Sequence, residues 1–192
     1  MTLRVPAAEL PSELSENMIG QFGAVPDPVA VMWHNPKVAQ AAMEFGGRTG
    51  EWDATAEGLK SIAHMAVAAQ VGCSFCLDIG YFQAQNQDLG LAKAREVPRW
   101  RESDAFTPLE RDVLEYAEAM STTPLSVTDE LSARLLDRLG PAAMVELTVV
   151  IAFANLSTRS NVALGVESQG FSANCAVPAP PRPDVAGLAS NA

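Results

Sequence analysis

Cys73 and Cys76 form a Cys-x-x-Cys motif that directly follows Gly72. Because glycine commonly ends a helix, we expect the cysteines at the start of the next one. At that place the unpaired backbone N–H groups and the positive end of the helix dipole favour the thiolate form of cysteine. Thiolates attack peroxides and disulfides, and two sulfurs at this spacing can join in a disulfide. The motif therefore predicts thiol redox chemistry.

Other roles for the cysteine pair are open. A structural zinc site needs four nitrogen or sulfur ligands, and beyond the pair the sequence offers only Cys175, His34 and His64. We therefore expect no metal and no other cofactor. Two buried cysteines can also serve simply as small hydrophobic residues. A thioredoxin-like site is disfavoured, because that motif follows a strand and here a helix precedes it.

Three polar residues are candidates for proton transfer. His64 lies on the preceding helix and is a candidate base, with a hydrogen-bonded core histidine as the alternative. Asp78 follows Cys76 by two residues, and its alternative role is to complement the helix dipole. Glu146 lies in a strongly apolar helix, where either catalysis or an ion pair with Arg159 or an interface lysine would account for it.

Trp33, His34 and Tyr81 are the candidate substrate-binding residues. Trp33-His34-Asn35-Pro36 combines an aromatic ring, an imidazole and a helix interruption. We expect this segment either to line a pocket or to pack the first helix on the core. Tyr81 is expected in the core or in a pocket wall.

The elements that must position these residues are expected to be helical nearly throughout. The sequence shows no sustained period-two alternation and no Asn-Gly or Asp-Gly hairpin signal, so we expect an all-α fold. Helices are expected at 11–22, 27–45 with a break at Pro36, 55–71, from 73 onward, from a capping box at Thr107 and Glu110, at 128–139 and at 142–171.

The last expected helix, 142–171, is apolar on most sides in its first half. It is predicted to be either the central buried helix or an oligomer interface. A shift of 85 residues lays 70–76 on 155–161, which suggests a duplicated helical hairpin. Residues 1–173 are expected to form a single domain and 174–192, rich in proline and alanine, a disordered tail containing a free Cys175.

The composition excludes several classes of function. With 23 Asp and Glu against 13 Lys and Arg the net charge is −10, which repels phosphate and argues against a nucleic-acid partner. The longest apolar stretch, 147–154, is too short to span a bilayer, and the amino terminus has no apolar signal region. Three cysteines, an odd number with two of them close together, do not make a secreted disulfide framework. We expect a soluble, cytoplasmic protein without membrane association.

The sequence over residues 60–80 resembles the core of the alkylhydroperoxidase D-like, or carboxymuconolactone decarboxylase, family. In that family an apolar helix ends in Gly-Cys-x-x-Cys and the next helix follows at once. Residues 107–111 and 145–171 resemble later helices of its members, so the resemblance covers roughly 10–172. It implies an alkylhydroperoxidase D-like helical bundle and homo-oligomers, often trimers or hexamers, without metal or flavin.

In members with both cysteines the resemblance implies peroxide reduction, whereas true lactone decarboxylases generally lack the pair. Cys76 then corresponds to the cysteine that attacks a small-molecule hydroperoxide, and Cys73 to the one that resolves it. An external dithiol or disulfide reductase restores both. The family's relay glutamate and histidine are replaced by Ser61 and Gly80, which cannot act as acid or base, so an efficient cycle needs a substitute such as His64.

Two further functions stay open at this point. One is a decarboxylase or lactone-processing enzyme that acts on a small carboxylate, with Lys60, Arg159 or Arg48 providing positive charge in the pocket. The other is a non-catalytic, redox-sensing oligomer, which the two missing relay residues favour.

Overall fold

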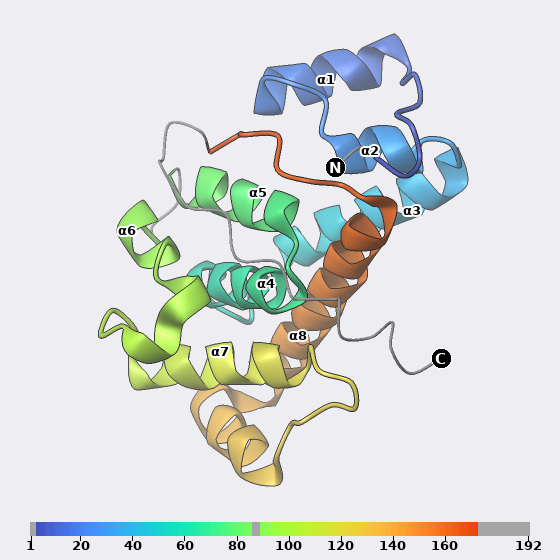
Figure 1. Cartoon of the computed structure of the whole chain (residues 1–192). Helices are drawn as coiled ribbons and strands as arrows, with labels where there is room; N and C mark the ends of the chain where they lie inside the picture. The colour runs from blue at the N-terminus through green and yellow to red at the C-terminus, as the bar shows by residue number, and fades with distance from the viewer. Residues whose placement is uncertain (1–2, 86–88, 173–192) are drawn as a thin grey trace, which may run out of the picture.

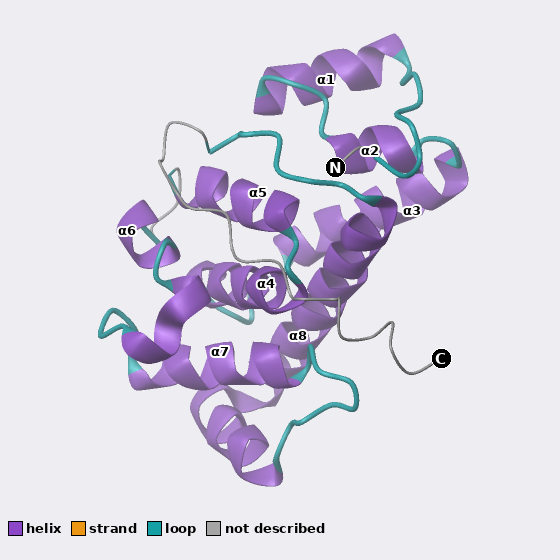
Figure 2. Ribbon diagram, viewed as in Figure 1, coloured by secondary structure: helices purple, strands orange, loops and turns teal. Residues whose placement is uncertain are grey.

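The computed structural model describes residues 3–85 and 89–172, so the expected tail and Cys175 lie outside the described residues. Within these ranges the regular structure is entirely helical, which confirms the all-α prediction (Figures 1 and 2). The elements are α1 (Ser12–Phe22), α2 (Asp27–Met32), α3 (Pro36–Glu51), α4 (Glu57–Val71), α5 (Ser74–Ala84), α6 (Leu91–Ala94), the 3₁₀ helix η1 (Val97–Glu102), α7 (Pro108–Ala119) and α8 (Asp129–Leu164).

The central helix is α4, which contacts α5, α7, α8 and η1. Its buried positions point in several directions around the helix and include Ile62, Ala63, Met65, Ala66, Val67 and Ala68. A helix that is apolar on most sides must be surrounded by other elements, and the small alanines allow those elements to approach closely. The central position was one of two alternatives predicted for the last helix. That alternative is wrong, because α4 occupies the centre.

The last helix, α8, instead has one buried and one exposed apolar face. Leu147 and Ile151 are fully buried, whereas Val145 is 65% and Leu156 57% exposed. Among the described residues α8 is also the one helix that could cross a membrane by length and composition alone, which is weak evidence because core helices share those properties.

Glycines set the bend and the carboxyl-terminal end of α8. Gly140 adopts φ 74° and ψ 168° and, with Pro141, kinks the helix where the sequence predicted a break. Gly165, with φ 74°, caps the helix after Leu164, so α8 ends seven residues before the predicted end at 171. Residues 155–161 lie inside α8 rather than in a turn, so the expected second hairpin does not form.

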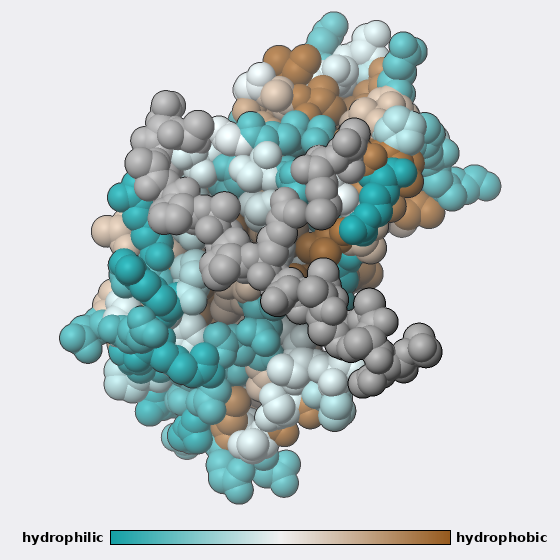
Figure 3. Space-filling view, in the orientation of Figure 1, coloured by the Kyte–Doolittle hydropathy of each residue, from teal (hydrophilic) through white to brown (hydrophobic). Residues whose placement is uncertain are grey.

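The other predicted helix ends differ in accuracy. The capping box of Thr107 and Glu110 is present in both directions at the start of α7. In contrast, α3 does not close at its glycines but continues to Glu51, and Gly46 lies against the Phe153 ring of α8. The short α6 and η1 were not predicted. On the face shown in Figure 3, hydrophobic side chains gather over α1 to α3 and hydrophilic ones over α6, η1 and α7.

Residues 166–172 form what we call the C-terminal strap, an extended segment after α8. In Figure 1 this orange segment passes between α5 and the α1–α2 pair. Ser168 N–H donates to Ser74 Oγ at 3.1 Å. The Gln169 side chain accepts from Asp27 N at 2.7 Å and donates to the Val25 carbonyl at 3.1 Å. The strap therefore ties the amino-terminal helices to the helix that carries the cysteines.

Candidate active site

The two cysteines lie where the sequence predicted them. Gly72 ends α4 with φ 79°, and Cys73 is the N-cap residue of α5. Cys73 Sγ accepts a hydrogen bond from Cys76 N–H at 3.2 Å. The two sulfurs are joined in a disulfide, with 5.4 Å between the Cα atoms. Cys76 thus lies in the first turn of a helix, where the dipole favours a thiolate after reduction.

Asn161, in the last turns of α8, is the polar residue closest to both sulfurs among the contacts of the described residues. Its Nδ2 donates to Cys76 Sγ at 3.4 Å and lies 4.0 Å from Cys73 Sγ. A buried amide donor at this distance stabilises negative charge on sulfur. Sequence reasoning missed this residue, although the 85-residue shift had laid Asn161 on Cys76.

Cys76 lies in the wall of an apolar cavity of about 270 Å³, formed by α2, α3, α4, α5 and α8. Its polar lining consists of His64, Ser157, Ser160 and Asn161. Most other lining side chains are large and apolar, among them Met32, Met43, Phe75, Ile79, Phe153 and Leu156. Cys73 does not line this cavity, so Cys76 is the sulfur that a substrate would meet first.

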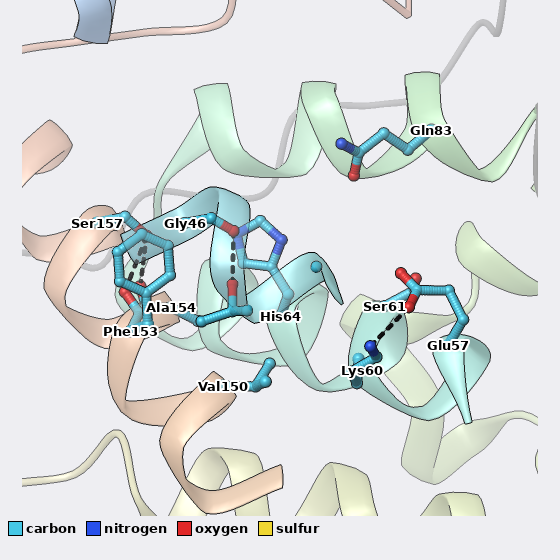
Figure 4. A pocket seen from close by; sticks show the side chains of 12 residues that line it. Gly46, Glu57, Lys60, Ser61, His64, Gln83, Val150, Phe153, Ala154 and Ser157 are labelled. Carbon is cyan, nitrogen blue, oxygen red and sulfur yellow. Dashed lines mark hydrogen bonds and ion pairs between the residues drawn. The ribbon is translucent and has the colours of Figure 1, made fainter. Parts of the chain in front are cut away.

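A second, polar cavity, also about 270 Å³, adjoins the first (Figure 4). The two cavities share four lining residues, Gly46, His64, Phe153 and Ser157. The polar cavity is otherwise lined largely by hydrophilic side chains of α3, α4 and α5, namely Thr49, Glu57, Lys60, Ser61 and Gln83.

His64 is the titratable residue that both cavities have in common. Its imidazole makes no hydrogen bond with any of the described residues. Burial lowers the pKa of His64 below the ordinary value of 6.5. The ring is therefore uncharged at neutral pH and able to accept a proton.

Asp78, the second candidate for proton transfer, faces the C-terminal strap and lines neither cavity. Its carboxylate accepts hydrogen bonds from the backbone N–H groups of Gly170, Phe171 and Ser172 and from the hydroxyls of Ser168 and Ser172. Burial alone would raise the pKa of Asp78, but the hydrogen bonds outweigh burial and hold that pKa below its ordinary value. Asp78 therefore has a structural role in binding the strap, and it does not line the cavities that His64 lines.

Glu146 also has structural partners. Its carboxylate accepts from Ala54 N–H at 2.9 Å and Thr55 N–H at 3.0 Å, and lies 3.9 Å from Lys60 Nζ. The expected ion pair of Glu146 with Arg159 is wrong, because the Arg159 guanidinium donates to Ser121 O at 2.5 Å.

The three predicted substrate-binding residues do not line either cavity. His34 is exposed, and its Nε2 lies 2.9 Å from the Pro6 carbonyl. Trp33 is the C-cap of α2, whose residues Pro28 and Met32 line the apolar cavity instead. Tyr81 is only 4% exposed, and burial, against a smaller effect of Arg95, raises its pKa to about 12. We therefore do not include these three residues in the site.

The two positions at which the resemblance led us to expect relay residues, Ser61 and Gly80, differ in surroundings. Ser61 lines the polar cavity. Gly80 is packed so closely that a Cβ atom there would lie 2.7 Å from Met65 Cγ. A histidine at position 80 would therefore require Met65 to move. Among the described residues no group of three or more His, Cys, Asp or Glu could hold a metal ion.

Comparison with known proteins gives a family match over part of the chain and a similar fold. Residues 36–119, which contain α3 to α7, match the model of the carboxymuconolactone decarboxylase family. The uncharacterized protein YnjA of Escherichia coli (strain K12) is 37% identical over 120 residues, which are 62% of this chain and 64% of YnjA. The match thus spans slightly less than two thirds of that relative.

Two solved structures have similar folds. One is an AhpD core, an uncharacterized peroxidase-related protein from Ralstonia eutropha JMP134, with a TM-score of 0.77, 19% identity and coverage of 92% of this chain and 97% of that one. The other is a cysteine-to-alanine variant of the debrominase Bmp8 in complex with 2,3,4-tribromopyrrole, with a TM-score of 0.75, 21% identity and coverage of 85% and 88%. At these identities the likeness shows the fold alone.

Proposed function

We propose that the chain is a thiol-dependent hydroperoxide reductase, because residues 36–119 match the model of the carboxymuconolactone decarboxylase family and the chain has an AhpD-like fold. The observation that supports this activity best is the position of Cys76. Its sulfur lies in the wall of an apolar cavity, 3.4 Å from the amide nitrogen of Asn161, and His64 lines the same cavity. Cys73, which is joined to Cys76 in a disulfide in the structure, then resolves the oxidised sulfur.

The reaction begins with the reduced dithiol. His64 accepts the proton of the Cys76 thiol, and the thiolate attacks the terminal oxygen of the hydroperoxide. The O–O bond breaks, Cys76 becomes a sulfenic acid, and the leaving alkoxide takes the proton back from His64 to form an alcohol. Cys73 then attacks the Cys76 sulfur, a disulfide forms and water leaves. An external dithiol supplies two electrons and two protons to restore the thiols.

Each neighbouring group has a task in this cycle. The Asn161 amide and the amino-terminal end of α5 stabilise the Cys76 thiolate. His64 takes the place of the relay residues that Ser61 and Gly80 do not supply. The apolar lining excludes water from the attacking sulfur, which strengthens these electrostatic interactions.

We include a homo-oligomer in the proposal. The exposed apolar face of α8, with Val145 65% and Leu156 57% exposed, and Phe45 of α3 at 42%, offers hydrophobic surface for a second copy. The trimeric or hexameric state and the cytoplasmic location expected from the sequence remain predictions.

The test is a stoichiometric reaction of the reduced protein with cumene hydroperoxide, followed by thiol titration and mass spectrometry. The expected result is prompt formation of the Cys73–Cys76 disulfide, reversed by a dithiol. The Cys73→Ser variant should accumulate a sulfenic acid that dimedone traps, and the matched Cys76→Ser variant should not. If the wild-type thiols react no faster than free thiol controls, the proposal is overturned.

One observation favours a second candidate function, the carboxylate chemistry expected as an alternative. Of its three candidate cations Lys60 lines the cavity beside the site, whereas Arg159 and Arg48 do not line it and bind Ser121 and Glu44. Activity on small carboxylates or lactones would survive Cys76→Ser, whereas hydroperoxide reduction would not. The Bmp8 structure contains a brominated pyrrole, so bromide release from that compound is a further activity to assay on the same variants.

A further inference from the structure

The polar cavity is not used by the proposed reaction, although it adjoins the apolar cavity that contains Cys76. Figure 4 shows Lys60 and Glu57 at one end of it and His64, Gly46 and Phe153 at the other, where the two cavities meet. A ligand that occupied both would have one polar and one apolar part.

Lys60 is the positively charged residue that lines this cavity. Its side chain is only 7% exposed, and its Nζ donates to the Trp52 carbonyl at 2.7 Å and pairs with Glu57 at 2.8 Å. Glu146 Oε1, at 3.9 Å, lies beyond hydrogen-bond distance. An ammonium group has three N–H donors, so these two acceptors leave one donor for another partner. Since buried donors need acceptors, this donor favours a ligand with a negatively charged oxygen.

Glu57 is the group that such a ligand would replace. It lies three residues before Lys60 on α4, and its side chain is 59% exposed. Ion pairs with one solvent-exposed partner are weak, so Glu57 can turn into solvent at little cost. Glu146 does not compete in the same way, because its carboxylate is held by the N–H groups of Ala54 and Thr55.

We propose that the substrate is an amphipathic hydroperoxide that carries a carboxylate. The carboxylate binds Lys60 in the polar cavity, and the apolar body with the peroxide group lies in the apolar cavity beside Cys76. The passage between them depends on Gly46, because a Cβ atom there would approach the Phe153 ring to 3.1 Å. This inference rests on the proposed function for the reaction, while the carboxylate site can be tested by binding alone.

The experiment compares a fatty-acid hydroperoxide with its methyl ester, which differ only in the charge of the head group. For the wild type we expect a KM about tenfold lower for the acid, as one charge-assisted hydrogen bond would give. Lys60→Met should bring the acid-to-ester ratio of KM to about one. Glu57→Gln should increase the preference for the acid, because it removes the carboxylate that competes for Lys60. Arg48→Gln is the matched control, since it removes an exposed positive charge that lines neither cavity.

A binding measurement separates this inference from the proposed reaction. Calorimetric titration of the Cys76→Ser protein with the parent fatty acid requires no turnover. Tighter binding of the acid than of its ester, increased by Glu57→Gln, would support the site even if no hydroperoxide were reduced. Equal binding of acid and ester by both the Cys76→Ser protein and its Glu57→Gln derivative would overturn it. Because Glu57 is exposed, this variant decides the question even if Lys60→Met fails to fold.

Discussion

The hydrogen bonds to Asp78 allow a quantitative prediction for Asp78→Asn. One carboxylate oxygen accepts from Ser168 Oγ at 2.8 Å, Gly170 N at 2.8 Å and Phe171 N at 3.0 Å. The other accepts from Ser172 N at 2.7 Å and Ser172 Oγ at 2.6 Å. An amide has one oxygen and one NH₂ group, and the NH₂ group cannot accept. The substitution therefore removes at least two of the five hydrogen bonds.

The magnitude follows from the kind of bond that is lost. Hydrogen bonds to charged groups contribute about 1.5 to 3 kcal/mol each, with the lower part of that range appropriate for a partly exposed strap. Two lost bonds then lower the free energy of unfolding by about 3 kcal/mol.

The same carboxylate makes stability depend on pH. The hydrogen bonds hold the pKa of folded Asp78 below its ordinary value of 3.8, in spite of the opposing effect of burial. Since the unfolded chain binds the proton more readily, this contribution is fully present above the ordinary pKa and is lost as the pH falls through the folded pKa. Asp78→Asn should therefore lose less stability than the wild type on acidification below about pH 4.

Urea unfolding of the reduced protein, followed by circular dichroism at pH 7 and pH 3, measures both effects. Asp137→Asn is a suitable control, because it makes the same chemical change at an exposed position on α8. If the Asp78 and Asp137 variants unfold at the same urea concentration at pH 7, the strap is not held by this carboxylate and the reasoning is refuted.

Three further predictions follow from single positions. Gly80→Ala should lower the free energy of unfolding by about 1 to 3 kcal/mol, because the added Cβ meets Met65 Cγ at 2.7 Å; unchanged thermal unfolding would contradict this packing. Asn161→Leu should slow alkylation of the reduced Cys76 thiol about tenfold at pH 7, and an alkylation profile against pH that matches the wild type would exclude a role for the amide. Leu156→Glu should shift the protein to smaller species in sedimentation velocity, and an unchanged distribution would place any interface between copies elsewhere.

Local signals in the sequence were sufficient for most helix starts. The capping box at Thr107 and Glu110 and the glycine before Cys73 act within a few residues, so their effect is visible without knowledge of the fold. The end of α8 was missed, because Gly165 ends the helix through its own backbone conformation, at φ 74°.

The arrangement of the helices could be predicted less well from the sequence. Both α4 and α8 are rich in apolar residues, and composition does not tell which of two such helices is covered on all sides. The structure places α4 at the centre because its alanines allow several helices to approach, whereas α8 retains exposed residues such as Val145 and Leu156.

The residues of the candidate site could likewise be predicted only in part from the sequence. The spacing of Cys73 and Cys76 identified the reactive pair, and the position of His64 on α4 identified a candidate base. Asn161 and Phe153 come to Cys76 from a helix far along the chain, and no local pattern marks them. The segment of His34 was expected either in a pocket or packed between the first helix and the core, but the His34 imidazole binds the Pro6 carbonyl of a segment that sequence patterns did not place.

The C-terminal strap also has a consequence for the order in which the chain is synthesised. Asp78 leaves the ribosome before its most distant partner, Ser172, which lies 94 residues later. At a typical rate of about 5 to 20 residues per second, this separation corresponds to roughly 5 to 20 s. During that interval α5 already carries both cysteines, while the carboxylate beside them has none of its five donors. In the nascent chain both thiols are therefore present before the C-terminal strap can bind the helix that carries them. A reducing compartment would protect the thiols until the last residues of the strap are made.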